Sequence, residues 1–293
     1  MLMSENYGKL TAIHLDPIEK KPLYHFIPGS YVLSVGSVGC NMQCVFCQNS
    51  EISQSSVDQY LGLKTYRAEE LLQLAMQTSG NIGLAYTYNE PTVFYEFMLE
   101  TAMLAREQKL KNVVVSNGYI SEKPLQALLE YADAFNIDLK AFDQTFYAKY
   151  AHASLEPVKK CLLQIRKAGK HLEITNLLIP GLNDNESVFR EMISWINGEL
   201  GTDTIFHLSR YFPRYKLAVE STPVPLLEKM YSIAARQLTY VYVGNIRENR
   251  WQDTYCPGCH ACVVVRDGYQ VNRNGLTADG NCSHCGSKIV AMG

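Results

Sequence analysis

The feature that most constrains the fold of this chain is an alternation of short apolar runs with longer amphipathic stretches between residues 31 and 243. The short runs are rich in β-branched and aromatic residues, as buried strands are, and the longer ones carry apolar residues three or four positions apart, as helices do. Repeated strand–helix units favour a parallel sheet. About six units are too few to close an eight-stranded barrel. The sequence therefore predicts an α/β fold, a partial (βα)6 TIM-like barrel that stays open.

The individual elements follow from this periodicity. The predicted strands are residues 31–36, 82–87, 112–117, 134–139, 171–179, 205–209 and 239–244. The predicted helices between them are residues 68–77, 92–109, 123–132, 156–168, 186–196 and 225–238. Several of these helices begin beside a proline or a capping residue. In parallel βα folds the chemistry lies where the strands end, so polar residues at those positions are the candidates for a site.

Three segments are expected along the chain. Residues 1–30 form an N-terminal extension with a loop-like stretch, residues 31–250 form the partial barrel, and residues 251–293 form a small cysteine-rich module of zinc-ribbon type. A chain of 293 residues is long enough to bury the core of one large domain with a small appendage.

Charge and hydropathy exclude some classes of partner. The chain carries 27 Lys and Arg against 29 Asp and Glu, so no overall charge favours nucleic acid or an anionic membrane. The first residues lack the charged and apolar regions of a signal peptide, and no apolar run approaches the ~18 to 20 residues of a membrane span. We expect a cytoplasmic protein that does not bind a membrane.

Most of the nine cysteines fall in two clusters. Cys40, Cys44 and Cys47 follow the first predicted strand in the spacing C-x3-C-x2-C. Three thiolates can hold three irons of a [4Fe–4S] cluster and leave the fourth iron without a protein ligand. An open metal position is what catalysis requires. The alternatives for these three cysteines are a zinc knuckle completed by a distant residue, or free thiols. The ninth cysteine, Cys161, lies on a predicted amphipathic helix and is expected to be buried as a small apolar residue.

This cysteine loop resembles that of the radical S-adenosylmethionine (SAM) superfamily, in which an aromatic residue precedes the last cysteine. Phe46 occupies that position here. The resemblance implies a [4Fe–4S] cluster whose open iron binds SAM, and reductive cleavage of SAM to a 5′-deoxyadenosyl radical. The protein then orients SAM and excludes water from the radical.

Two further stretches resemble superfamily motifs but differ from them at some positions. "YNEP" follows the second strand and places Glu90 where the superfamily has a Gly-Gly-Glu-Pro stretch that holds the ammonium of SAM. "VSNG" at the end of the third strand resembles the Asp-Thr-Asn-Gly stretch of glycyl-radical-enzyme activases, which makes Asn117 a candidate while Val115 replaces the aspartate. For Glu90 the alternative is an acidic residue favoured only by the dipole of the next helix.

The later strands add candidates of the same kind. "DLK" at the end of the fourth strand matches the activases and makes Asp138 and Lys140 candidates for contacts with SAM or a cation, both on one side of the strand. A structural ion pair is the alternative. His207 lies where activases often have a histidine near the sugar of SAM, although a satisfied core histidine fits equally. Asn245 is a weaker candidate for the adenosine, and Asn185 could simply cap a helix.

The second cysteine cluster contains two C-x2-C pairs. Cys256, Cys259, Cys282 and Cys285 flank an alternating segment that predicts a hairpin. Four thiolates give Zn²⁺ a closed tetrahedral site, so we expect zinc there. The nearby Cys262 and two histidines keep an auxiliary iron–sulfur cluster open as the alternative. So small a module would need its metal in order to fold.

Taken together, the opening block to Asn49, "YTYNEPTVFYE", "IPGLND", "VYVGN" and the C-terminal pairs resemble the radical SAM component of the AmmeMemoRadiSam system, related to the pyruvate formate-lyase-activating enzyme. The resemblance implies hydrogen abstraction from a substrate that the sequence does not identify, with a protein and a nucleic acid among the candidates. It also implies an electron donor such as flavodoxin or ferredoxin, and the other AmmeMemoRadiSam proteins as partners. Two alternatives stay open: a glycyl-radical-enzyme activase, and a non-catalytic iron–sulfur and zinc module that binds nucleic acid or protein.

Overall fold

The structure is a computed structural model that describes residues 4–246 and 251–292. It contains an eight-stranded sheet in the order β10-β9-β8-β7-β6-β5-β3-β2. Seven of these strands are parallel, and β2 (Ala12–Pro17) pairs antiparallel with β3 at one edge. Because no ladder joins β2 to β10 among the described residues, the barrel stays open, as the number of repeats predicts.

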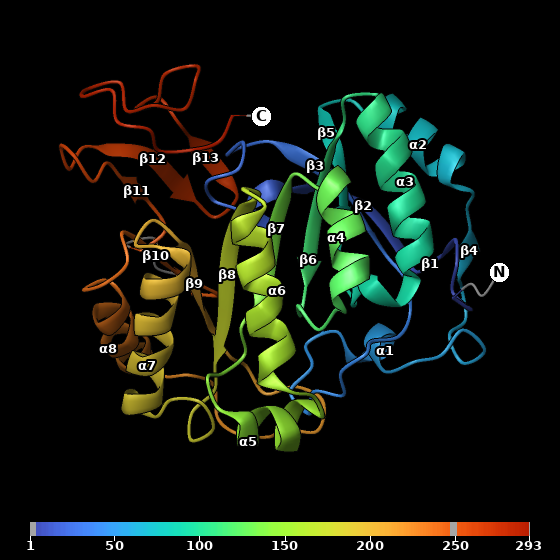
Figure 1. The fold of residues 1–293 in the computed structure, drawn as a ribbon, viewed down its shortest axis with the longest axis horizontal. Coiled ribbons are helices and arrows are strands. Elements are labelled where there is room, and N and C mark those ends of the chain that lie inside the picture. Colours follow the sequence, from blue (N-terminus) through green and yellow to red (C-terminus); the bar gives the residue numbers. More distant parts are fainter. Residues whose placement is uncertain (1–3, 247–250, 293) are drawn as a thin grey trace.

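The strands and helices of the barrel confirm the predicted alternation. The parallel strands are β3 (Tyr31–Gly36), β5 (Asn81–Tyr86), β6 (Lys111–Ser116), β7 (Ala134–Asp138), β8 (His171–Leu178), β9 (Ile205–Arg210) and β10 (Tyr240–Gly244). The crossover helices are α2 (Ala68–Gln77), α3 (Tyr95–Glu107), α4 (Glu122–Tyr131), α6 (Leu155–Lys167), α7 (Glu186–Trp195) and α8 (Val224–Ala234). The helices cover the outer face of the sheet, where their apolar stripes bury the main core (Figure 1).

Short elements lie in the loops. They are β1 (Lys9–Leu10), η1 (Ile18–Lys20), α1 (Ser50–Ser53), β4 (Lys64–Thr65), η2 (Pro91–Phe94), α5 (Gln144–Phe146), η3 (Tyr147–Ala151) and η4 (Ile196–Leu200). β1 and β4 form a separate two-stranded sheet. None of the helices in the described part of the chain combines the length and the apolarity needed to span a bilayer.

The N-terminal extension belongs to the barrel. After β2 it packs Ile18, Leu23 and Phe26 against residues from β3, β5, β6 and β7 in a second apolar cluster. This cluster fills one end of the barrel interior, because the participating strand residues lie on the inner face of the sheet. The sequence patterns did not predict this role, since the extension has no helical or strand periodicity of its own.

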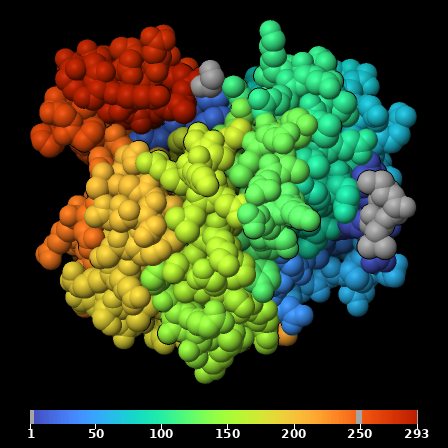
Figure 2. Space-filling view, in the orientation of Figure 1, coloured from blue at the N-terminus to red at the C-terminus, as the bar shows by residue number. Residues whose placement is uncertain are grey.

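The C-terminal module is a three-stranded sheet that docks on the barrel and the extension. Its strands are β11 (Thr254–Tyr255), β12 (Cys262–Asp267) and β13 (Gln270–Asn272), and β12 and β13 form the predicted hairpin. Figure 1 shows the module at the end of the molecule opposite to α1 and α5. In Figure 2 it forms a red lobe, with blue atoms of the extension visible beside it.

Candidate active site

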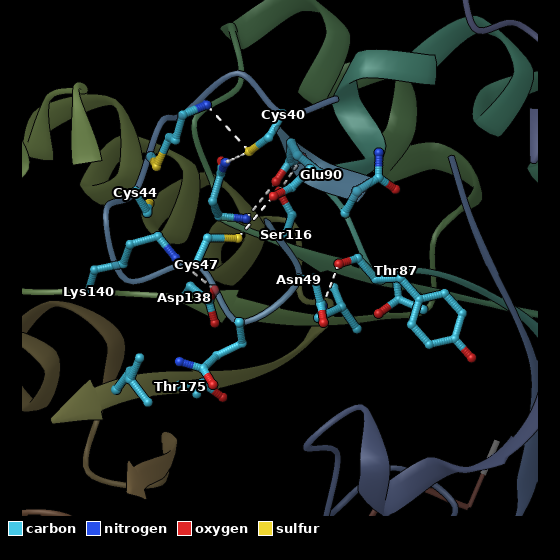
Figure 3. Close-up of a pocket in the computed structure, with 18 of the residues that line it drawn as sticks. Cys40, Cys44, Cys47, Asn49, Thr87, Glu90, Ser116, Asp138, Lys140 and Thr175 are labelled. Atoms are coloured by element: carbon cyan, nitrogen blue, oxygen red, sulfur yellow. Dashed lines mark hydrogen bonds and ion pairs between the residues drawn. The ribbon is translucent and has the colours of Figure 1, made fainter. Parts of the chain in front are cut away.

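A cavity of about 530 Å³ lies at the carboxyl ends of the parallel strands. Its wall comes from the loop at residues 37–49, here called the cysteine loop, and from side chains at the ends of β5 to β8. The predicted site residues that line it are Cys40, Cys44, Phe46, Cys47, Glu90, Asn117, Asp138 and Lys140. Figure 3 shows the three cysteines and the acidic and basic side chains around one common space. The volume suits a small-molecule site, for which about 300–1,000 Å³ is usual.

Amide groups hold the cysteine loop against the barrel. The side chain of Asn89 accepts the N–H of Ser37 at 2.9 Å and donates to the carbonyl of Gly39 at 2.9 Å. Further along the loop, the N–H of Gln43 donates to the carbonyl of Ala151 at 2.9 Å. These bonds tie the loop to the end of β5 and to η3, so the positions of the cysteines follow from the barrel itself.

The sulfur atoms of this loop receive hydrogen bonds from the surrounding protein. Cys40 Sγ accepts the N–H of Met42 at 3.4 Å and the side-chain amide of Asn117 at 3.6 Å, and Cys47 Sγ lies 2.9 Å from the hydroxyl of Ser53. Burial raises the pKa of the Cys40 thiol to about 12. A bound metal ion supplies the positive charge that turns such a thiol into a thiolate ligand, and N–H donors to sulfur tune iron–sulfur clusters.

Glu90 is buried at the junction of β5 and β6. Its Oε1 accepts the N–H of Thr92 at 3.1 Å and the hydroxyl of Ser116 at 2.8 Å, and its Oε2 accepts the N–H of Asn117 at 2.8 Å. Burial raises the pKa of Glu90, and these donors oppose that shift. The carboxylate therefore fixes the end of β6, including Asn117, beneath the cysteine loop.

Tyr88 and Asn89 stand where the resemblance places two glycines. Tyr88 adopts the left-handed region with a φ of 70°, a conformation that glycine enters without strain. Its hydroxyl donates to Asp16 Oδ2 of the extension at 2.5 Å. The backbone geometry of glycine is thus kept at Tyr88, and the added side chain ties the end of β5 to the extension.

Asp138 and Lys140 form an ion pair at the end of β7. Lys140 Nζ lies 2.8 Å from Asp138 Oδ2, so the two side chains meet on one side of the strand as the alternation predicts. Burial by itself lowers the pKa of Lys140, but the Asp138 carboxylate outweighs it and raises that pKa above its ordinary value. The pair can offer an ammonium and a carboxylate oxygen to a polar ligand in the cavity.

Other candidate residues do not line the cavity. His207 is buried on β9, where its Nε2 lies 2.6 Å from Glu173 Oε2. Asn245 donates to the hydroxyl of Ser209 at 2.9 Å. The structure thus places both residues in other hydrogen bonds, and for His207 the arrangement is that of a satisfied core histidine.

Three further residues named in the sequence analysis make local contacts, two by packing and one by capping a helix. Phe46, within the cysteine loop, packs on Phe146 with ring centroids 5.7 Å apart. Asn185 caps α7 by accepting the N–H of Ser187 at 3.0 Å. Cys161 is buried in α6, as its amphipathic pattern predicts.

Comparison with known proteins identifies the family. The sequence pattern of the radical SAM superfamily matches residues 34–196. The chain belongs to the radical SAM superfamily. An uncharacterized protein of Methanocaldococcus jannaschii is 41% identical over 99% of this chain and 86% of its own length. The (2S)-3-sulfopropanediol dehydratase activating enzyme of Klebsiella oxytoca is 24% identical over 41% of this chain and 38% of its own length, so the chain spans well under half of that enzyme.

A solved structure with bound S-adenosylmethionine shows the same fold. Streptococcus suis SuiB bound to S-adenosylmethionine has a TM-score of 0.59 and 13% identity, covering 73% of this chain and 52% of that one. Family membership confirms the predicted superfamily and partial-barrel fold, and it supports an enzyme over a binding module without turnover. A radical SAM enzyme uses SAM and an iron–sulfur cluster.

The residues around the cavity fit this cofactor set. Three cysteines on one loop face a space that two charged side chains also reach, and sulfur is the ligand that iron–sulfur clusters require. The donors to Cys40 and Cys47 stabilise negative charge on their sulfur atoms. Cluster and SAM would therefore share the cavity, with Asp138 and Lys140 on the opposite wall from Cys40 (Figure 3).

Sequence reasoning missed several residues that line this cavity. They are Lys20, Lys21, Asn49, Ser53, Tyr88, Asn89 and Thr175. Lys20 and Lys21 belong to the loop-like stretch of the extension, where no periodicity indicates that the chain enters the barrel. Two adjacent lysines before a proline were the available signal, and such a pair is usually a solvated surface feature.

The four C-terminal cysteines form a second candidate metal site. The Sγ atoms of Cys256, Cys259, Cys282 and Cys285 all lie within 4.8 Å of one another. A tetrahedral Zn²⁺ with Zn–S bonds of about 2.3 Å needs sulfur atoms about 3.8 Å apart. Cys262 instead points its thiol at the carbonyl of Val264, at 3.8 Å, and lies outside the group. The four thiols could therefore hold one metal ion, as their spacing in the sequence predicts.

Proposed function

We propose that this radical SAM enzyme holds a [4Fe–4S] cluster on Cys40, Cys44 and Cys47 and cleaves SAM reductively. The chemistry that cluster and SAM supply when bound is one-electron cleavage to a 5′-deoxyadenosyl radical, which abstracts hydrogen from a substrate in the same cavity. The observation that carries this proposal is the meeting of the three cysteines with Asp138 and Lys140 around one space of about 530 Å³.

Each wall of the cavity has a distinct task in this proposal. The cysteine loop supplies three sulfur ligands, and its bonds to Asn89 keep it in place. Asn117 is held by Glu90 and directs its amide at Cys40 Sγ. The Asp138–Lys140 pair binds polar groups of SAM, and the apolar packing around Phe46 limits access of water to the radical.

The test is SAM cleavage by anaerobically reconstituted protein. With dithionite as the reductant, the wild-type chain is expected to release 5′-deoxyadenosine, and Cys44→Ala to release none because one iron loses its ligand. Cys161→Ala is the matched control, since Cys161 is a buried cysteine outside the cavity. Wild-type protein that carries an intact cluster and binds SAM without cleaving it would refute the proposal.

A second candidate function is activation of a glycyl-radical enzyme. The observation that favours it is the similarity to the Klebsiella oxytoca activating enzyme, which covers 41% of this chain. The substrate would then be a protein, and the reductant a flavodoxin or ferredoxin. A glycine-centred radical signal that appears on a partner protein only with SAM and this enzyme would support it; SAM cleavage without such a signal on any candidate partner favours another substrate.

The proposal extends to the C-terminal metal and to the AmmeMemoRadiSam partners. We assign zinc to Cys256, Cys259, Cys282 and Cys285, because their sulfur atoms are close enough for one tetrahedral ion. Metal analysis of anaerobically purified protein should find about one zinc per chain besides the cluster iron; iron in place of zinc would instead indicate an auxiliary cluster.

Co-purification with the other proteins of the AmmeMemoRadiSam system tests the proposed association.

A further inference from the structure

The N-terminal extension brings two lysines to the wall of the cavity. Lys20 ends η1, Lys21 follows it, and both line the same space as the cysteine loop. They lie before the 34–196 stretch that matches the superfamily. Their place at the cavity calls for a role specific to this chain and to relatives that share the extension.

The two ammonium groups share one carboxylate. Lys20 Nζ lies 2.8 Å from Asp16 Oδ1, and Lys21 Nζ lies 2.7 Å from Asp16 Oδ2. The hydroxyl of Tyr88 donates to the same Oδ2. Burial raises the pKa of Asp16, but these three donors outweigh it and lower that pKa below its ordinary value, so Asp16 is ionised. Two positive charges against one negative charge leave a net charge of +1 in this group.

Lys21 also has unused hydrogen-bonding capacity. Its side chain is 2% exposed, and its ammonium lies 4.5 Å from the ring centroid of Tyr88. An ammonium group has three N–H donors, and within the described residues its hydrogen bond is to Asp16. Burial lowers the pKa of Lys21, and Asp16 opposes that shift. A second negative charge beside Lys21 would therefore be stabilised by the site and would in turn stabilise the charged lysine.

The other charged groups of the cavity have hydrogen-bond partners of their own at the ends of β6 and β7. Asp138 and Lys140 neutralise each other in their own ion pair. The Glu90 carboxylate is committed to three donors at the end of β6. Neither carboxylate is paired with Lys20 or Lys21, so the local excess of positive charge lies on the extension.

We propose that Lys20 and Lys21 bind an anionic group of the substrate, a carboxylate or a phosphate. This inference rests on the proposed function, because it takes the cavity to be the place where the substrate meets the radical. The anionic group would accept N–H groups of the two lysines that Asp16 leaves free, and it would set the orientation of the substrate. SAM would keep its contacts at the cysteine loop and at the Asp138–Lys140 pair.

The experiment measures anion binding and SAM binding separately on the full chain with its cluster reconstituted. Inorganic phosphate and acetate are the probes, titrated by calorimetry with and without SAM. Lys20→Met and Lys21→Met are compared with Lys167→Met, which removes an exposed lysine at the end of α6. Because Lys20 is 45% exposed, Lys20→Met leaves the fold intact even if Lys21→Met does not fold.

The expected result is binding of at least one probe by the wild type, weakened about tenfold or more in either cavity variant. Lys167→Met should match the wild type, and the affinity for SAM should change less than about twofold in all variants. A preference for phosphate or for acetate then distinguishes the two anion chemistries.

Two results would overturn the inference. The first is probe binding that neither lysine substitution weakens, or no probe binding at all. The second is a parallel loss of SAM affinity, which would make the lysines contacts of SAM. If the probes bind as expected but the wild type does not cleave SAM, the proposed function fails while the anion site stands, so the two failures are distinguishable.

Discussion

Arg266 of the C-terminal module stacks on the ring of Tyr24 of the extension, with the guanidinium carbon 4.2 Å from the ring centroid. Its Nη2 donates to the Tyr24 carbonyl at 2.7 Å, and its Nη1 donates to the hydroxyl of Thr254 at 2.8 Å. The side chain is 1% exposed. Tyr24 lies three residues beyond Lys21, so the module is joined to the part of the extension that reaches the cavity.

Removal of this buried arginine should weaken the whole junction. Arg266→Met leaves the carbonyls of Tyr24 and Gln252 without their donor, which we expect to lower the free energy of unfolding by about 2–4 kcal/mol. Urea unfolding and limited proteolysis of the module measure the effect. Arg273→Met, at an exposed position of the module, is the control. Equal stability of the two variants would contradict a supporting role for Arg266.

Substitutions in the two cysteine groups should remove different metals. Cys44→Ala is expected to lose the cluster and SAM cleavage together, whereas Cys282→Ala loses the module metal, loosens residues around His25 and keeps part of the cleavage. His25 is affected because its Nδ1 lies 2.8 Å from the carbonyl of Ile289 in the module. Cys262→Ala, outside the four-thiol group, should change neither metal.

Metal analysis and the yield of 5′-deoxyadenosine test this separation. Complete loss of cluster iron in Cys282→Ala, equal to that in Cys44→Ala, would contradict it. Treatment of the wild type with a zinc chelator should reproduce the Cys282→Ala phenotype, because bound metal contributes folding free energy to small modules of this kind.

Protonation of His25 should destabilise the fold in acid. Its Nε2 lies 2.6 Å from the Tyr242 hydroxyl, and its Nδ1 faces a carbonyl, so the neutral ring with the proton on Nδ1 satisfies both partners. Burial lowers the pKa of His25 from 6.5 to about 4; Glu173 opposes this shift, and Arg266 and His171 add to it. The unfolded chain therefore binds more protons between these two values, and stability falls as the pH falls through that window.

Comparison of the wild type with His25→Gln measures how much this protonation contributes to the pH dependence of stability. A shift from 6.5 to about 4 corresponds to about 3 kcal/mol over the full window. Urea midpoints from pH 7.5 to pH 5 should fall more steeply for the wild type than for His25→Gln, which has no titrating ring. His14→Gln, at an exposed position, should keep the wild-type slope. Equal slopes for wild type and His25→Gln would refute the assignment.

The amide of Asn117 should tune the cluster. Asn117→Ala removes the donor that lies 3.6 Å from Cys40 Sγ, so the reduced cluster loses stabilisation and its reduction potential becomes more negative. One hydrogen bond of about 1 kcal/mol corresponds to roughly 40 mV for one electron. Potentiometry followed by electron paramagnetic resonance measures the shift. Asn49→Ala is the control, because it also alters the cavity but removes a hydrogen bond to the Tyr88 carbonyl. An equal change of reduction potential in Asn49→Ala would contradict a specific role for Asn117.

Local patterns in the sequence were sufficient for much of the architecture. Strand and helix periodicity predicted the seven parallel strands and six crossover helices within a few residues, because each element buries one continuous face. Cysteine spacing predicted both sulfur groups, since ligands on one loop or one hairpin are near each other in any fold. The alternation along β7 also predicted that Asp138 and Lys140 meet.

Sequence spacing carries no information on contacts between distant segments, and the tertiary structure decided these. The extension enters the barrel, so Asp16 meets Tyr88 and the backbone of Tyr24 meets Glu173. Glu173 in turn accepts a bond from His207, which removes that histidine from the cavity.

What the sequence by itself determined is therefore the family, the order of the βα units and the two groups of cysteines that lie together. The tertiary structure decided which residues of the extension join the predicted polar residues at the cavity, because packing brings segments together without regard to their separation along the chain. Lys20 and Lys21 illustrate this difference: their positions in the sequence indicate a surface loop, and the packing of Ile18 and Leu23 inside the barrel carries them to the site.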